Sequence, residues 1–557
     1  MPLRHRLLTL TMLATVLAPD GRAQASGTAT RKPATATRPA ATGTSSPSTR
    51  SGTAAGSATG RSTTRAGSST AKPAVASAAK RPAPRATSGA TRVAIKAAAP
   101  ASRDGLQDYL NELMRTATNA GHWGVMVVSL SRGDTLYAYN ADELLLPAST
   151  MKLYTSAIAL ERYGPAHQFR TEVLRDGALL ESGTVRGNLV LKGAGDPSFA
   201  PRYADWNRGA RPLDSLADLV ARAGVRRVTG DIVGDASAFD GERVPAGWRT
   251  RYLQASYAAR VSALSFNENL AHITVRPSTR GAVVAFAQPV SGLTLRSTVT
   301  VRPNSRSASI RVWQDTLTQQ FKVSGWIGSR SAVRTYQVVV EQPERYVAAA
   351  FRAALEARGI VVDGDVRVGA ATPGAQRITA WASPTLGQLV TKMNGESNNH
   401  FAELLFRNAA RAGGAVGSAQ IANESLRTFL SDRVGVDPAA VYAADGSGLS
   451  TLDRVTPRSM VLLLAYSAKA PWGDVLRASL PVAGRTETLR GRMRYTAAQG
   501  NLRAKTGTTG EVTSLGGFVR ARNGEELAFS FLYNGRELWR ARAAIDAMGV
   551  TLANFSR

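Results

Sequence analysis

The chain of 557 residues contains no cysteine, which excludes disulfides, thiolate metal sites and cysteine nucleophiles. Its five histidines form no pair at metal-ligand spacing, so we expect neither a metal site nor another cofactor. No apolar run is long enough to span a bilayer. What the chain does have is 43% apolar residues, enough to bury more than one core in a protein of this length.

The first 25 residues have the pattern of a secretory signal. Arg4 and Arg6 precede an apolar run at 7–17, and Ala23-Gln-Ala25 provides a small-residue cleavage site. A short membrane anchor is the alternative, which we disfavour because the run is too short. We therefore expect residues 1–25 to be removed from an exported, soluble protein, periplasmic or extracellular and associated with the cell wall.

Acidic residues are absent from 26–102, where twelve are Lys or Arg and most others are Ala, Thr, Ser, Pro or Gly. Such a segment cannot bury enough apolar surface to offset its ordering entropy, so we predict a disordered basic linker. The net charge of +29 resembles that of a nucleic-acid-binding protein, but an exported protein does not normally meet nucleic acid. An anionic wall polymer or membrane surface is the expected contact of the tail; mere solubility is the alternative.

From residue 103 onward, helical and strand patterns alternate in an order that predicts an α+β protein. A hairpin is expected over 123–139, and three strands followed by a helix are expected near the carboxyl end. Between them lies a β-rich stretch, and the helical pattern returns around Ile378. We interpret this as one domain of residues 103–165 and 378–557, interrupted by an inserted β-rich region at 166–377 that forms one or two subdomains.

Ser149 and Lys152 begin an apolar, helix-forming stretch after Pro147. On a helix, residues three apart share one face, so Lys152 would stand one turn from Ser149. A serine hydroxyl becomes a nucleophile when a base takes its proton, and a lysine can be that base when burial and a second cation lower its pKa. Ser69 and Ser77 have a lysine at the same spacing, but within the predicted linker. The alternative is an ordinary helix start capped by Ser149.

Two later motifs supply the other groups that such a pair needs. Ser397 and Asn399 lie between two helical patterns and offer a hydroxyl and an amide on a short turn. Lys505, Thr506 and Gly507 end a predicted strand, where the glycine would let substrate approach the backbone. The sequence thus provides a proton relay and a cationic strand, in that order.

In this order the three motifs resemble the active site of penicillin-binding proteins and serine β-lactamases. Within that group the chain is most similar to the D-alanyl-D-alanine carboxypeptidase/endopeptidase family typified by penicillin-binding protein 4, the S13 peptidases. The resemblance covers roughly residues 103–557 and includes a long insertion between the first and second motifs. It implies a transpeptidase-like domain, an antiparallel sheet flanked by helices. Further similar segments lie at 195–197, 230–235, 262–267, 445–450 and 480–484.

The resemblance also implies acyl transfer on peptidoglycan stem peptides. Ser149 would attack the carbonyl of the penultimate D-Ala with Lys152 as base, water would hydrolyse the acyl-enzyme, and β-lactams would trap it as inhibitors. Whether carboxypeptidase or endopeptidase activity dominates stays open. Ser397 and Asn399 would relay the proton and hold the substrate. Lys505 and Thr506, beside Gly507, would bind the substrate carboxylate, and the backbone amides of Ser149 and Thr508 would form the oxyanion hole. Asp235 and Phe239 would line a subsite for the side chain of the peptide.

Two positions depart from the family pattern. Glu487 precedes Thr488 and Leu489 where the family often has Gly-Thr-Leu, and Thr451 stands where many members have an arginine that helps bind the diamino-acid side chain. The preference for that side chain is therefore open. A β-lactamase is an alternative, disfavoured by the large insertion. A non-catalytic wall-binding protein is another, disfavoured because no catalytic side chain has been lost.

Overall fold

The computed structural model describes residues 97–207 and 209–557. The predicted signal at 1–25 and nearly all of the predicted linker at 26–102, with Ser69 and Ser77, lie outside the described residues. Within these residues, helices are combined with four sheets of three or more strands, which confirms the predicted α+β class. None of the helices in the described ranges has the length and apolar character needed to cross a membrane.

The two ends of the described chain share one antiparallel sheet of five strands, ordered β18-β19-β20-β1-β2. The β1–β2 hairpin confirms the one predicted, and β1 pairs along its whole length with β20. Nearly every residue of β19 and β20 is buried, which requires cover on both faces. The strands are β1 (His122–Ser129), β2 (Thr135–Tyr139), β18 (Arg503–Thr508), β19 (Val512–Arg520) and β20 (Glu526–Asn534).

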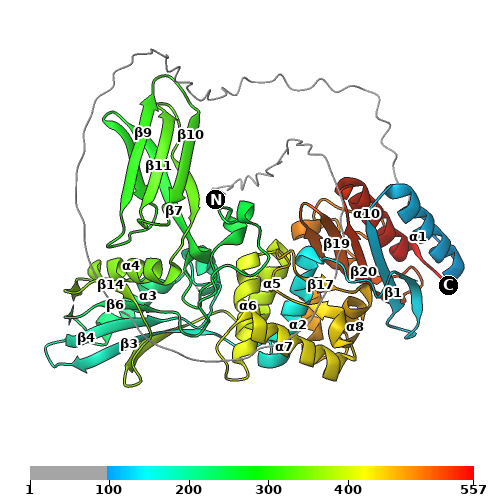
Figure 1. Cartoon of the computed structure of the whole chain (residues 1–557), viewed down its shortest axis with the longest axis horizontal. Helices are drawn as coiled ribbons and strands as arrows, with labels where there is room; N and C mark the ends of the chain where they lie inside the picture. Colours follow the sequence, from blue (N-terminus) through cyan, green and yellow to red (C-terminus); the bar gives the residue numbers. More distant parts are fainter. Residues whose placement is uncertain (1–96, 208) are drawn as a thin grey trace, which may run out of the picture. The chain divides into compact units, whose positions relative to one another are not determined.

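Helices provide that cover, as Figure 1 shows for α1 and α10 beside the strands. Phe529 and Phe531 point to the core shared with α1 and α10, whereas Ala528 and Leu532 point to the core of α2 and α8. α5, α6 and α7 also contact α2, which is therefore buried continuously over its first ten residues. The helices are α1 (Arg103–Ala117), α2 (Met151–Tyr163), α5 (Leu386–Glu396), α6 (Asn399–Arg411), α7 (Ala419–Phe429), α8 (Pro457–Ser467), α9 (Gly473–Ser479) and α10 (Leu538–Asn554).

The middle of the chain contains a mixed sheet of seven strands covered by two helices. β3 and β4 form its longest hairpin, while β5, β6, β13 and β14 add parallel pairs. The elements are β3 (Arg170–Leu179), β4 (Thr184–Lys192), β5 (Arg227–Val228), β6 (Ile232–Asp235), β13 (Val361–Val362), β14 (Val366–Val368), β15 (Gln376–Ala382), α3 (Pro212–Arg222) and α4 (Pro343–Glu356).

Two smaller sheets of three strands lie in the same middle region, ordered β12-β7-β8 and β10-β11-β9. They face each other, because β8 contacts β9, β11 contacts β7 and β10 contacts β12. The strands are β7 (Leu270–Ser278), β8 (Gly281–Phe286), β9 (Leu295–Arg302), β10 (Ala308–Gln314), β11 (Phe321–Gly328) and β12 (Arg334–Val339); a separate pair is β16 (Val441–Tyr442) with β17 (Arg454–Val455).

One predicted transition is wrong. Ile378 lies in β15, which pairs with β3, and the helical region begins only at Leu386. Pro384 explains the delay, since the residue before a proline is disfavoured in helical conformation. The sheet of the middle region thus runs to Ala382, past the predicted boundary at 377, and the division into one interrupted domain and an insert stays a prediction.

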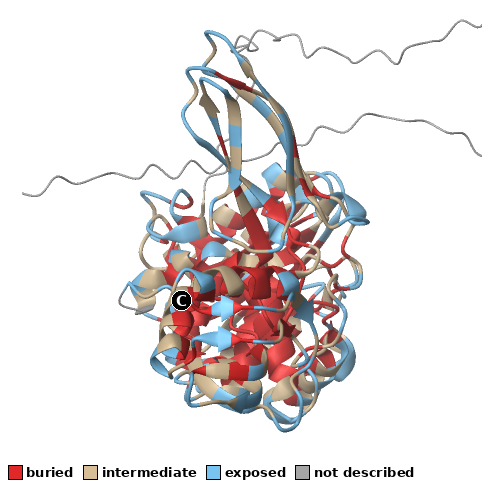
Figure 2. Ribbon diagram, turned by 90° about the vertical axis from the view of Figure 1, so that its left-hand side faces the viewer, coloured by how far each residue is buried: buried red, intermediate tan, exposed pale blue. Residues whose placement is uncertain are grey.

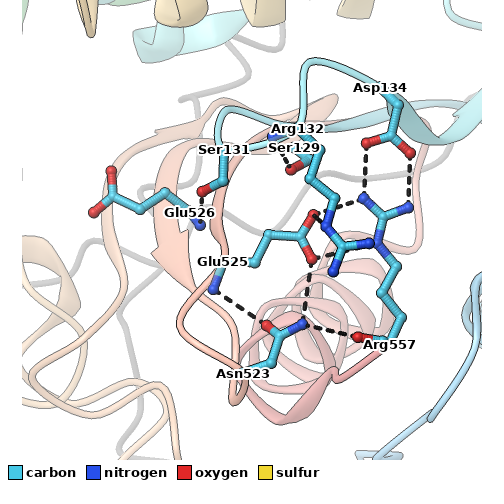
Figure 3. A network of polar contacts seen from close by, with 8 residues as sticks. All are labelled: Ser129, Ser131, Arg132, Asp134, Asn523, Glu525, Glu526 and Arg557. Atoms are coloured by element: carbon cyan, nitrogen blue, oxygen red, sulfur yellow. Dashed lines mark hydrogen bonds and ion pairs between the residues drawn. The ribbon is translucent and has the colours of Figure 1, made fainter.

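A polar network joins the β1–β2 turn to the β19–β20 turn and the last residue (Figure 3). Arg557 donates hydrogen bonds of 2.7 Å to both carboxylate oxygens of Asp134, and one of 2.6 Å to Glu525. The hydrogen bonds from Arg557 hold the pKa of Asp134 below its ordinary value. This network therefore connects the amino-terminal strands of the five-stranded sheet to its carboxyl-terminal strands.

Candidate active site

Ser149 lies in a 3₁₀ turn, η1 (Ala148–Thr150), that leads directly into α2. The preceding residue, Ala148, has φ of +47°, a conformation that costs a residue with a Cβ about 1 kcal/mol or more and often occurs at functional sites. Lys152 stands on the first turn of α2, and its Nζ donates a hydrogen bond of 3.0 Å to Ser149 Oγ. The structure thus brings the hydroxyl and the amine into direct contact.

The ammonium of Lys152 is fully buried and has three acceptors. Besides Ser149 Oγ, these are Asn399 Oδ1 at 2.8 Å and the Ser447 carbonyl at 2.7 Å. Burial lowers the pKa of Lys152 to about 8, against an opposing effect of nearby carboxylates, chiefly Asp445. The amine is therefore held close to its serine and can lose its proton near neutral pH.

Ser397 and Asn399 form the short connection between α5 and α6. Ser397 adopts the left-handed conformation, with φ of +59°, that ends α5, and the side chain of Asn398 caps α6. The tight reversal lets Asn399 reach Lys152 while its Nδ2 donates to the Tyr257 carbonyl at 3.0 Å. Asn399 therefore contacts the first motif, whereas Ser397 contacts Lys505 of the third.

Lys505 lies on β18, and its Nζ donates to Ser397 Oγ at 2.9 Å and to the Thr506 carbonyl at 2.8 Å. Its pKa is well below the ordinary value because the side chain is buried and because Lys152 adds a second positive charge. The two ammonium groups are therefore close enough for the charge of Lys152 to act on Lys505, and Lys505 holds the hydroxyl of the second motif. Lys505 is thus a second cation near Lys152 as expected, but the pKa of Lys152 itself is lowered by burial.

The space above Gly507 is filled by protein. A Cβ at this position would lie 2.1 Å from Ser514 Oγ and 3.0 Å from the backbone nitrogen of Ser149. The glycine therefore allows β18 to approach η1 closely, instead of leaving room for substrate as the sequence suggested. Because Gly507 has no side chain, β18 can lie directly beside Ser149.

A cavity of about 220 Å³ opens at Ser149. Two tyrosines from the middle region, Tyr252 and Tyr257, form part of its wall, and sequence reasoning gave no signal for them. The lining residues are Ser149, Tyr252, Tyr257, Asn399, Gly448, Leu449, Thr508, Thr509 and Gly510.

Asp445 organises the loop that supplies the Ser447 carbonyl to Lys152. It is fully buried, and its two oxygens accept hydrogen bonds from the backbone amides of four residues between 447 and 450 and from the indole of Trp248 at 2.7 Å. Glu403 lies nearby, and burial, with Asp445 second, raises its pKa to about 8. The segment 445–450 supported the resemblance, but its sequence alone did not reveal this supporting role.

Asp235 and Phe239 do not line the cavity at Ser149. Asp235 is buried and accepts hydrogen bonds from the amides of Ser237 and Ala371. Phe239 packs in a small apolar cluster that includes Leu404. Their contact with substrate stays a prediction.

The two departures from the family pattern have clear local structures. Glu487 has φ of +46°, which a glycine adopts without strain, and Thr488 accepts a hydrogen bond of 3.1 Å from Thr506 Oγ1. Thr451 donates to the Gly247 carbonyl at 3.0 Å. Glu487 therefore occupies a backbone conformation that favours glycine. Within the described ranges, no group of three or more His, Asp or Glu side chains is arranged to hold a metal ion.

Comparisons with known proteins identify similar chains. The chain is 34% identical over 449 residues, 78% of its length and 81% of the relative, to a D-alanyl-D-alanine carboxypeptidase of Actinomadura sp. (strain R39). It is 25% identical over 434 residues to D-alanyl-D-alanine carboxypeptidase DacB of Haemophilus influenzae, 76% of this chain and 88% of the relative.

The crystal structure of penicillin-binding protein 4 from Haemophilus influenzae superposes with a TM-score of 0.68 at 25% identity, covering 80% of this chain and 98% of that one. The model of the D-Ala-D-Ala carboxypeptidase 3 (S13) family matches residues 106–555. From this match over most of its length, together with the assembled motifs, we conclude that the chain belongs to the S13 family of serine peptidases.

Proposed function

We propose that the chain is a serine-type D-Ala-D-Ala carboxypeptidase, a D,D-endopeptidase, or both, acting on peptidoglycan stem peptides through an acyl-enzyme. The observation that carries this proposal is the 3.0 Å contact between Ser149 Oγ and the buried amine of Lys152. The named activity of the relatives supports the substrate class.

In the first step, neutral Lys152 takes the hydroxyl proton of Ser149, and the oxygen attacks the carbonyl carbon of the penultimate D-Ala. The negative charge that develops on the carbonyl oxygen is stabilised by the backbone amides of Ser149 and Thr508. Losing one such donor typically costs about 3 kcal/mol of barrier. Both residues line the cavity at the serine, which supports this assignment.

When the tetrahedral intermediate breaks down, the proton must reach the leaving amine. Ser397 is the proposed relay, which is supported by the hydrogen bond that its hydroxyl accepts from Lys505 and by its position two residues before Asn399, which holds Lys152. The amine leaves as free D-Ala, or as the cross-linked strand in the endopeptidase reaction. Water then attacks the ester carbonyl, Lys152 takes its proton, and Ser149 is released.

The terminal carboxylate of the peptide would be attracted by Lys505 and hydrogen-bonded by Thr506. This assignment rests on the motif and on the adjacent positions of the Lys505 ammonium and the Thr506 hydroxyl on β18. A β-lactam presents a carboxylate beside its reactive amide and is expected to bind in the same way, forming an ester that hydrolyses slowly. The known complex of the Haemophilus influenzae protein with a β-lactam illustrates the fold in an inhibitor-bound state.

We place this activity outside the cytoplasm, in the periplasm or associated with the wall, on the signal pattern at 1–25 and the peptidoglycan substrate. The basic segment 26–102 is proposed to contact an anionic wall or membrane surface through its twelve cationic residues.

The test is the intact mass of the protein after incubation with benzylpenicillin. We expect a stable adduct on the wild type and on a Ser77→Ala control, which changes the same Ser-x-x-Lys pattern elsewhere, and no adduct on Ser149→Ala. Release of D-Ala from a peptide ending in D-Ala-D-Ala should disappear with the adduct. Rapid destruction of penicillin without an adduct would instead show a β-lactamase, and intact penicillin without an adduct would show a non-catalytic protein.

A further inference from the structure

The sheet β10-β11-β9 has one apolar and one polar face. On the inner face, Val299, Ile310 and Val323 belong to the core shared with the neighbouring sheet. On the outer face, residues alternate with these and are exposed or half-exposed, as the tan and pale blue strands of Figure 2 illustrate. β9, β10 and β11 make their main contacts with one another and with β7, β8 and β12, so no other element of the described chain covers this outer face to a comparable extent.

The strand registers show which side chains share the outer face. Trp313 pairs with Lys322, which pairs with Arg296. The next row along the strands contains Arg311, and the following row contains Trp326. The outer face is made of Arg296, Thr298, Thr300, Arg302, Ser309, Arg311, Trp313, Lys322, Ser324 and Trp326.

Positive charge is concentrated in this part of the chain. Residues 270–339 contain nine Arg or Lys and a single acid, Asp315. That acid is paired with Lys322 at 2.5 Å. Arg296, Arg302 and Arg311 have no ion pair within the described ranges, and all three are exposed. The face therefore carries a positive potential that is not neutralised locally.

The two indoles contribute nothing to the apolar core. Neither Trp313 nor Trp326 is among the residues packed in the cluster that fills the inner side. The guanidinium of Arg302 lies 3.9 Å from the ring centroid of Trp326, which makes a flat, cationic surface. Four residues of β11 separate the rows of Trp313 and Trp326, about 13 Å along the strand at ~3.3 Å per residue.

We propose that this outer face, made of Arg296, Arg302, Arg311, Trp313 and Trp326 with the hydroxyls between them, binds an anionic polysaccharide. Sugar rings stack on indole faces, carboxylate or phosphate groups pair with guanidiniums, and Ser and Thr hydroxyls bond to sugar hydroxyls. A lipid surface fits less well, because the face presents no aliphatic side chain that could enter a bilayer. None of these residues lines the cavity at Ser149.

Binding is tested with the full chain carrying Ser149→Ala, so that acyl transfer plays no part. Immobilised polygalacturonate, a polymer of uronic acids, is the probe, at about 0.15 M NaCl where weak surface attraction is screened. We expect binding to polygalacturonate and none to neutral dextran. The combined change Arg296→Gln, Arg302→Gln and Arg311→Gln should weaken it about tenfold or more.

The matched control removes three other exposed arginines, by Arg490→Gln, Arg522→Gln and Arg536→Gln, and should leave binding unchanged. For the indoles, Trp313→Ala should weaken binding about fivefold. Trp539→Ala is its control, because Trp539 is an exposed tryptophan that does not belong to this face. Thermal melting of each variant separates lost binding from lost folding.

Three results would overturn the proposal. Equal weakening by the two arginine triplets would show that net charge alone matters. Binding of inorganic polyphosphate as tight as that of polygalacturonate, and unaffected by Trp313→Ala, would show a cationic surface without sugar recognition. Tighter binding to phosphatidylglycerol vesicles would assign the face to a membrane.

Discussion

Replacing Asn399 by aspartate tests the electrostatic setting of Lys152 with almost no change in shape. Asn399 Oδ1 accepts a hydrogen bond from Lys152 Nζ at 2.8 Å, so Asn399→Asp places a carboxylate at that distance. An opposite charge this close typically raises the pKa of a lysine by about 1–3 units. Starting from about 8, the pKa of Lys152 should rise to about 9–11.

The sign of the effect on activity follows from the role of Lys152 as a base. Only the neutral amine can accept the proton of Ser149, and a raised pKa keeps the amine protonated to higher pH. At pH 7 the neutral fraction should fall about tenfold to a thousandfold, since each unit is a factor of ten. Activity should recover in alkaline buffer, which a simple structural defect would not allow.

The assay is the second-order rate of acylation by a chromogenic β-lactam, measured from pH 6 to 11 for the wild type and the variant. The acid limb of the wild-type profile should have its midpoint at about 8, and that of Asn399→Asp one to three units higher. Asn304→Asp adds the same charge in an exposed turn and should leave the profile unchanged. An unmoved acid limb in Asn399→Asp would refute the assignment of Lys152 as the base.

Three further perturbations follow from the contacts around the site and the sheet. In Gly507→Ala the added Cβ would lie 2.1 Å from Ser514 Oγ, so urea unfolding should show a loss of about 1–3 kcal/mol; an unchanged midpoint would contradict the close approach. Asp445→Asn removes a charge that accepts several backbone hydrogen bonds, which should cost about 3 kcal/mol and slow acylation, whereas wild-type values in both assays would count against its supporting role. Because the pKa of Asp134 is depressed by Arg557, this pair stabilises the protein fully above the ordinary pKa of the carboxyl, and the effect is lost as pH falls from about 4 through the depressed pKa. Arg557→Ala should therefore make the melting temperature less dependent on pH between about 5 and 3, and an identical slope for both proteins would argue that the contact is not energetic.

Local patterns carried the prediction of the elements that build the five-stranded sheet. The alternation over 123–139 and the Asn523-Gly524 turn each specify a hairpin from neighbouring residues. The order of the three motifs also predicted which side chains would meet. Proline chemistry was underused, however: Pro384 keeps the chain extended beyond Ile378, where apolar spacing alone suggested that the helical region had begun.

The remaining contacts of the site depend on long-range packing, which no local pattern encodes. Tyr257 reaches the cavity from the middle region. Its role becomes visible only in the folded structure, where its carbonyl accepts a hydrogen bond from Asn399. Asp445 is one acidic residue among forty, and its role follows from burial and from the amides that converge on it. The role of Gly507 could not be predicted from the sequence either. A glycine that makes room for a ligand and a glycine that makes room for a neighbouring segment of the chain look identical in a sequence.

The pairing of β1 with β20 has a consequence for how the molecule comes to fold. β1 is synthesised near the start of the described chain, and its partner only near the end. Until β20 arrives, one edge of the β1–β2 hairpin is unpaired, and exposed strand edges invite aggregation. The site of Ser149 is likewise incomplete until Lys505 has been synthesised. The newly made chain is therefore expected to depend on protection of that edge, and to gain its reactive serine only as the last strands dock.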